Sequence, residues 1–176
     1  MNLALAVVAL AVALDLAQRA QLLARWPQRS VAVAAAITAV AVAGISLVAT
    51  PLLDALDVSA PTMQAGAGMV LVLWSAWMLV RWDIEPAPTR RPGVVQTSDA
   101  VVPGVFPLLL TPVLGVVALA VAARRGVLVT IAPVALGLAL LVVAGRFLAR
   151  RPLRQLGAVV GIVVGIALLA DGVLDV

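Results

Sequence analysis

Four polar side chains interrupt the first apolar stretch of the chain in its second half. Asp15, Gln18, Arg19 and Gln21 follow the apolar residues 1–14. Asp15 and Arg19 are four residues apart, so a continuous helix would place the acid and the base on one face. An ionisable side chain at the bilayer centre costs ~2.5–3.5 kcal/mol on insertion scales and typically marks a solute or ion pathway. The pair therefore predicts a site in which Asp15 carries a coupling proton and Arg19 holds an anionic group.

A second interpretation of the same residues stays open. The membrane span could end near Asp15, with the long side chain of Arg19 extending to the lipid headgroups.

Three prolines crowd the fourth apolar stretch, in the run Pro103-Gly-Val-Phe-Pro107-Leu-Leu-Leu-Thr-Pro112. Each proline lacks an N–H and disturbs a carbonyl one turn earlier. In hydrocarbon such broken backbone is tolerated only inside the protein or beside a watered cavity. The run therefore predicts a discontinuous helix that lines a solute or ion site, to which Thr111 adds a hydroxyl. The alternative is a structural kink, with Pro103 starting the helix.

Small residues recur on two other apolar stretches. Their glycines are Gly66, Gly68, Gly157, Gly161 and Gly165. Glycines four residues apart, as in the last three, let helices approach closely. These residues predict helix packing, including self-association between copies, and not chemistry.

Several kinds of chemistry have no residues to support them. The chain has no cysteine and no histidine, which excludes disulfides, thiolate chemistry and histidine-based metal sites or acid–base catalysis. We find no phosphate-binding loop, paired catalytic carboxylates or nucleophile-plus-base motif. The sequence predicts a protein that is not an enzyme and that holds no cofactor or metal. Its twelve basic residues, all arginine, stand at the ends of apolar stretches. They predict contacts with lipid headgroups and no nucleic-acid partner.

The composition requires a lipid environment. The chain of 176 residues is 64% hydrophobic and 11% charged, with a mean hydropathy of +1.19, against ~45–50% apolar and ~25% charged in soluble domains. A membrane-spanning helix needs about 20 mostly apolar residues. Six stretches fit and predict an all-α bundle of six transmembrane helices: Asn2–Ala24, Ser30–Leu53, Pro61–Val80, Ala100–Ala123, Gly126–Leu148 and Pro152–Gly172.

The six stretches divide into two similar halves. Residues 1–80 and 100–176 each contain a polar- or proline-broken stretch, a plain one and a glycine-opened one, and residues 81–99 form a polar loop between them. Gln64-Ala-Gly66 and Gln155-Leu-Gly157 open the corresponding third stretches. Three crossings per half would insert the second half upside-down, which predicts the inverted repeats of many transporters.

The arginines predict the orientation in the membrane. Loops one, three and five carry Arg25, Arg29, Arg81, Arg90, Arg91, Arg150, Arg151 and Arg154, whereas loop two and the C-terminal end carry Asp54, Asp57, Asp171 and Asp175. By the positive-inside rule the odd loops face the cytoplasm and both termini lie outside. Arg124 and Arg125 disagree, because loop four falls on the outer side. Either the rule is violated there or the fourth stretch does not cross as a simple helix.

The proline run and two glycine-containing stretches of the chain resemble the MarC family of bacterial inner-membrane proteins, within the wider LysE-type exporter superfamily. The family's fourth helix carries P-x3-P-L-L-x2-P-G, which Pro103, Pro107-Leu-Leu and Pro112 match, with Val113 in place of the glycine. Residues 57–66 are similar to the stretch before the family's third helix, and residues 157–172 to its last helix, which closes with Asp-Gly. The family's first helix holds N-P-x-G, where this chain has Asp15-Leu-Ala-Gln18. A site built from two broken half-helices would therefore use Asp15 and Arg19 in place of unwound backbone.

Together these patterns predict an inner-membrane transporter or exporter of a small polar solute, with a proton or another ion as a coupling partner. The expected site lies between helices one and four, near the midplane of the bilayer. The alternative is a non-transporting scaffold or complex subunit that packs through its glycine-rich helices.

Overall fold

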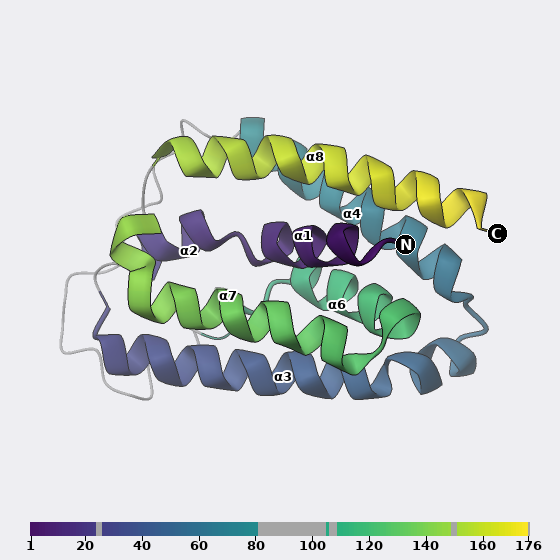
Figure 1. Cartoon of the computed structure of the whole chain (residues 1–176), viewed down its shortest axis with the longest axis horizontal. Helices are drawn as coiled ribbons and strands as arrows, with labels where there is room; N and C mark the ends of the chain where they lie inside the picture. Colours follow the sequence, from purple (N-terminus) through teal and green to yellow (C-terminus); the bar gives the residue numbers. More distant parts are fainter. Residues whose placement is uncertain (24–25, 81–104, 106–108, 149–150, 176) are drawn as a thin grey trace.

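The computed structural model describes the main chain of residues 1–23, 26–80, 105, 109–148 and 151–175, and the side chains of these residues except 22, 144–148 and 151–154. This part of the chain is all α-helical and forms an elongated bundle (Figure 1). The helices are α1 (Leu3–Leu14), α2 (Leu16–Leu23), α3 (Gln28–Ala55), α4 (Ala60–Val80), α6 (Pro112–Arg125), α7 (Val127–Leu148) and α8 (Arg151–Leu174). With α1 and α2 taken as one broken helix, the described residues make six helices.

Four of these helices are long and apolar enough to cross a membrane. They cover Leu3–Gln21, Gln28–Ala55, Ala60–Val80 and Gln155–Leu174, and the apolar part Val127–Val143 of α7 is a shorter candidate. Their outward faces carry large apolar side chains, among them Val40, Leu73 and Val163. The predicted class, an all-α protein with several membrane-spanning helices, is confirmed at this level.

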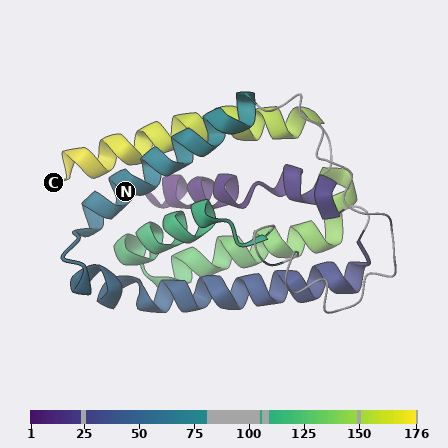
Figure 2. The same ribbon diagram turned by 180° about the vertical axis from the view of Figure 1, so that it is seen from behind.

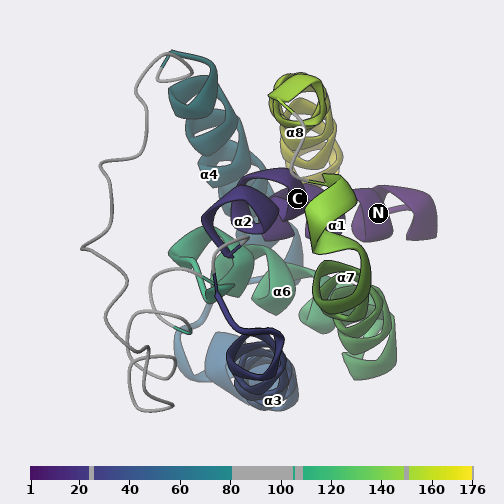
Figure 3. The same ribbon diagram turned by 90° about the vertical axis from the view of Figure 1, so that its left-hand side faces the viewer.

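The broken first helix lies in the middle of the bundle. An end-on view shows α4 and α8 side by side on one flank, α1, α2 and α6 in the centre, and α3 on the opposite flank next to α7 (Figure 3). The reverse view shows that α6 reaches only part of the way along the bundle (Figure 2). The core is centred on the inward faces of α1 and α6, where Ala6, Leu10, Leu114 and Val117 are buried, and the other described helices each add buried apolar side chains to it.

Glycines set the close packing of α4 against α8. A Cβ on Gly165 would come within 2.8 Å of the carbonyl oxygen of Gly68, and one on Gly68 within 2.6 Å of the carbonyl oxygen of Gly165. Gly161 faces Ser75 in the same interface, whereas Gly66 and Gly157 face open space. Three of the five predicted packing glycines therefore act within this chain, between its third and last helices.

Candidate solute site at two helix breaks

The first membrane helix is broken at Asp15. This residue ends α1 in a left-handed conformation (φ 43°, ψ 58°), and α2 starts at the next residue. Its N–H donates to the carbonyl of Val12 at 2.9 Å. Asp and Asn are the side chains, after glycine, that most readily adopt this conformation. The prediction of a continuous helix is therefore wrong at this position. Asp15 and Arg19 still attract each other electrostatically across the break.

A second break precedes α6. The N–H of Leu110 donates to the carbonyl of Val105 at 2.7 Å, an i→i+5 bond that differs from the i→i+4 bond of an α-helix. Thr111 then caps α6, because its hydroxyl accepts from the N–H of Leu114 at 3.2 Å. Pro112 occupies the first helical position, where a missing N–H costs nothing. Of the predicted proline-run residues, Thr111 and Pro112 thus stand at a helix start, and Pro103 and Pro107 lie outside the described residues.

Arg19 joins the two breaks. Its side chain is 3% exposed and donates through Nη1 to the carbonyl of Leu109. Through Nη2 it donates to the carbonyl of Ala13 at 3.2 Å and to the hydroxyl of Thr111 at 3.3 Å. The carbonyls at a helix end lack intrahelical partners, and the planar guanidinium offers five N–H donors in a fixed arrangement. One side chain on α2 therefore satisfies the main chain at both interruptions, and does not extend to a bundle end.

The other polar residues of the first helix lie beside this junction in sequence. Within the described part of the chain, the amide oxygen of Gln18 is buried and has no hydrogen-bond partner. Gln21 is half-buried and contributes none of the bonds that hold Arg19. A buried acceptor without a donor lowers stability by about 1–3 kcal/mol. The Gln18 oxygen is therefore a position at which the N–H or O–H of a solute would gain a hydrogen bond.

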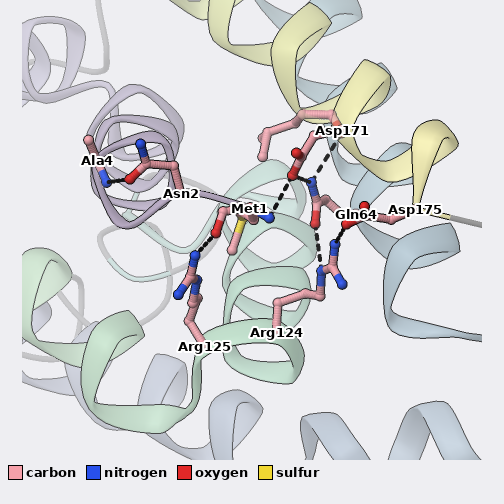
Figure 4. Close-up of polar contacts among 9 residues, drawn as sticks. Met1, Asn2, Ala4, Gln64, Arg124, Arg125, Asp171 and Asp175 are labelled. Carbon is pink, nitrogen blue, oxygen red and sulfur yellow. Dashed lines mark hydrogen bonds and ion pairs between the residues drawn. The ribbon is translucent and has the colours of Figure 1, made fainter.

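A second polar cluster occupies the end of the bundle that carries both termini (Figures 1 and 4). Gln64 of α4 is fully buried. Its amide nitrogen donates to Asp171 Oδ2 at 2.7 Å and to the carbonyl of Leu168 at 3.3 Å, and its oxygen accepts from Arg124 Nε at 2.9 Å. Arg124 also pairs with Asp175.

The N-terminal residue belongs to this second cluster. The amino nitrogen of Met1 lies 2.7 Å from Asp171 Oδ2, and Arg125 donates to the carbonyl of Met1. Arg124 and Arg125 are the two arginines that do not fit the predicted orientation. Arg124 pairs with Asp175, just beyond α8, and Arg125 binds the main chain of Met1. Pairing with Asp175 compensates the charge of Arg124, so its place beside the acids has a local cause.

The sequence patterns predicted residues of the first cluster, such as Asp15, Arg19 and Thr111, but not the cluster around Gln64. The sequence pattern marks Gln64 only as the start of a repeat and does not predict its contacts with α6 and α8. The available signal was its type, since an amide inside an apolar helix needs partners. Comparison of the chain with family models, curated proteins and solved structures finds no match, so the resemblance to the MarC family stays a prediction.

Proposed function

We propose that this protein is a membrane transporter of a small polar solute, which binds between the broken first helix and α6. The observation that carries the proposal is the buried guanidinium of Arg19, which donates to the main chain at both helix breaks. Transporters commonly bind solutes near the midplane, where discontinuous helices expose main-chain groups to the substrate. Two interruptions joined by one cation fit that plan.

The charge of Arg19 favours a solute-binding role over a purely structural one. Its three hydrogen-bond acceptors among the described residues are neutral oxygens, those of Leu109, Ala13 and Thr111. Asp15 adds an opposite charge that attracts the guanidinium. A neutral amide could donate to such oxygens, whereas a buried cation adds a desolvation cost. In this proposal the charge of Arg19 attracts Asp15 before the solute binds and an anionic group of the solute when the solute is bound. Asp15, at the first break, is the candidate carrier of a coupling proton.

The pairing of the helices supports two inverted repeats, in which α1/α2, α3 and α4 correspond to α6, α7 and α8. The contact of α4 with α6 has its counterpart in that of α8 with α1 and α2. The contact of α3 with α6 has its counterpart in that of α7 with α1 and α2. Corresponding helices also touch in pairs, α1 with α6, α3 with α7 and α4 with α8. A two-fold relation in the membrane plane produces this pattern, and α4 and α8 would lie beside its axis.

The resemblance to the MarC family is consistent with the same proposal, and we infer from it a location in a bacterial inner membrane. The arginine pattern would then put both termini outside the cell. The scaffold alternative depends on glycines that are free to meet a partner. Gly66 and Gly157 have that freedom, but Gly68, Gly161 and Gly165 already pack between α4 and α8.

Solute exchange by the purified protein tests the proposal. Proteoliposomes preloaded in turn with small carboxylates, inorganic phosphate, neutral amino acids and sugars are tested for counterflow of the same labelled solute. We expect at least one anion-bearing solute to exchange faster than in protein-free vesicles. No exchange with any solute, together with a stoichiometric partner of another sequence in native mass spectrometry from mild detergent, would favour the scaffold.

A further inference from the structure

We propose that the polar cluster at the terminal end of the bundle is a latch that closes the solute path on that side. The terminal latch comprises Met1, Gln64, Arg124, Arg125, Asp171 and Asp175 (Figure 4). The inference rests on the proposed function, because it assigns to the latch the control of access to the site at Arg19.

Two half-helices lead from the Arg19 junction to the latch. Helix α1 runs from the terminal end to the break at Asp15, and α6 runs from Thr111 back to the same end (Figure 1). The two helices contact each other, and their buried side chains include Ala6, Leu10, Val117 and Val121. A solute that leaves the junction toward this end must therefore part α1 and α6 from their packing.

The latch holds the outer ends of these half-helices. Arg125, the last residue of α6, donates to the carbonyl of Met1, two residues before the start of α1. Arg124 ties the same end of α6 to Gln64 of α4 and to Asp175 beyond α8. Met1 and Gln64 belong to the first half of the chain, and the other members belong to the second half. Movement of one half against the other would break the contacts that Met1 and Gln64 make with the second half. The Arg124–Asp175 pair lies within the second half and holds Arg124 in place for these contacts.

The ion pair of Arg124 with Asp175 in the latch is partly exposed to solvent, so it can break and re-form. The side chains of Arg124 and Asp175 are 21% and 45% exposed, and such ion pairs are weak in water and are screened by salt. Gln64 is fully buried with its amide satisfied, so it anchors α4 to α8. The arginines of α6 are therefore the members that release first.

Thiol labelling tests the latch without any solute, because the natural chain has no cysteine. Ala6→Cys places a reporter at a fully buried position of α1, and Ala34→Cys places a control at a fully buried position of α3. Both are made in protein with an intact latch and in the double variant Arg124→Gln/Arg125→Gln, in nanodiscs that expose both faces to a charged thiol reagent. Arg29→Gln, which removes an exposed arginine on the first turn of α3, is the matched charge control.

We expect the double variant to label Ala6→Cys at least about tenfold faster, with Ala34→Cys and the Arg29→Gln background unchanged. In the intact latch, raising NaCl from about 0.05 M to about 0.5 M should speed labelling of Ala6→Cys several-fold, because salt screens the ion pairs. Unchanged labelling of Ala6→Cys in both experiments would overturn the latch. Equal acceleration at Ala34→Cys would also overturn it, since that pattern means general loosening.

The latch and the proposed function fail by different results. If the latch variant labels Ala6→Cys faster but Arg19→Gln exchanges solute as fast as the natural protein, the latch is supported and the solute site at Arg19 is wrong. If Arg19→Gln loses exchange but labelling of Ala6→Cys is unchanged in the latch variant, the solute site is supported and the latch is wrong.

Discussion

The guanidinium of Arg19 donates a hydrogen bond to the main-chain carbonyl of Leu109, 90 residues further along the chain. This bond connects the broken first helix to the segment that precedes α6. Since Arg19 also donates to Ala13, the same side chain satisfies carbonyls on both sides of the junction. The stability of the bundle and the proposed solute site therefore depend on one residue.

Replacing Arg19 with leucine should destabilise the protein more than replacing it with glutamine. Leucine leaves the carbonyls of Leu109 and Ala13 without a donor, at about 1–3 kcal/mol for each buried group left unpaired. Glutamine keeps two N–H donors but removes the opposite charge that attracts Asp15. We expect the midpoint of thermal unfolding in detergent to fall in the order natural protein, Arg19→Gln, Arg19→Leu. Equal midpoints for the two variants would show that the carbonyls do not need Arg19.

Asp15→Gly should be more stable than Asp15→Ala, although glycine is the poorer helix former. Both changes remove the carboxylate, so their difference reports the left-handed backbone at this position. A Cβ in that conformation costs about 1–2 kcal/mol, and we expect the free energies of unfolding to differ by about 1 kcal/mol in favour of glycine. SDS-induced unfolding followed by tryptophan fluorescence measures the difference. A more stable alanine variant would indicate that α1 and α2 are continuous in the protein.

Gly165→Ala should destabilise the α4–α8 pair, whereas Gly157→Ala on the same helix should not. A Cβ on Gly165 would lie 2.6 Å from Val72 Cγ2 and 2.9 Å from the main-chain nitrogen of Val72, and at Gly157 it meets nothing within 4 Å. Overpacking of this kind costs about 1–3 kcal/mol. Alanine at an open helical position adds about 0.5–1 kcal/mol of stability. We expect the unfolding midpoint to fall in Gly165→Ala and to rise in Gly157→Ala, relative to the natural protein. An unchanged midpoint in Gly165→Ala would contradict the close packing.

Thr111→Val should lower stability by about 1 kcal/mol, and Thr111→Ser should preserve it. The hydroxyl of Thr111 accepts from Leu114 at the start of α6 and also from Arg19. Valine has nearly the same shape but cannot cap a helix, and loss of a cap typically costs ~1 kcal/mol. Hydrogen exchange of the first turn of α6 gives the local readout, with faster exchange expected only in the valine variant. Equal exchange in both variants would mean that α6 starts without this cap.

Hydropathy, prolines and charges predicted most helix ends closely. The expected stretches Ser30–Leu53, Pro61–Val80 and Gly126–Leu148 correspond to α3 (Gln28–Ala55), α4 (Ala60–Val80) and α7 (Val127–Leu148). Lipid-exposed helices must be apolar along their whole length, so their ends coincide with the first charged or helix-breaking residues. Polar interruptions at Asp15 and at the proline run also indicated where the bundle departs from regular helices.

The contacts between those interruptions were beyond the sequence. Asp15 breaks the helix through a left-handed conformation that its residue type permits but does not require. The acceptors of Arg19 are main-chain carbonyls, which any residue supplies, so nothing in the identities of Ala13 or Leu109 marks them. Gln64 and Arg124 meet because α4, α6 and α8 converge at one end, and that convergence is a property of the packed bundle.

Counterflow by Arg19→Gln tests the central claim most directly, with Arg29→Gln as the matched loss of one arginine. Each variant is reconstituted at equal protein density, and exchange of the most active anion-bearing solute is compared with that of the natural protein. We predict that Arg19→Gln loses at least about tenfold in exchange rate while Arg29→Gln stays within about twofold. Equal rates in a folded Arg19→Gln protein would show that the junction of the two broken helices is not where the solute binds.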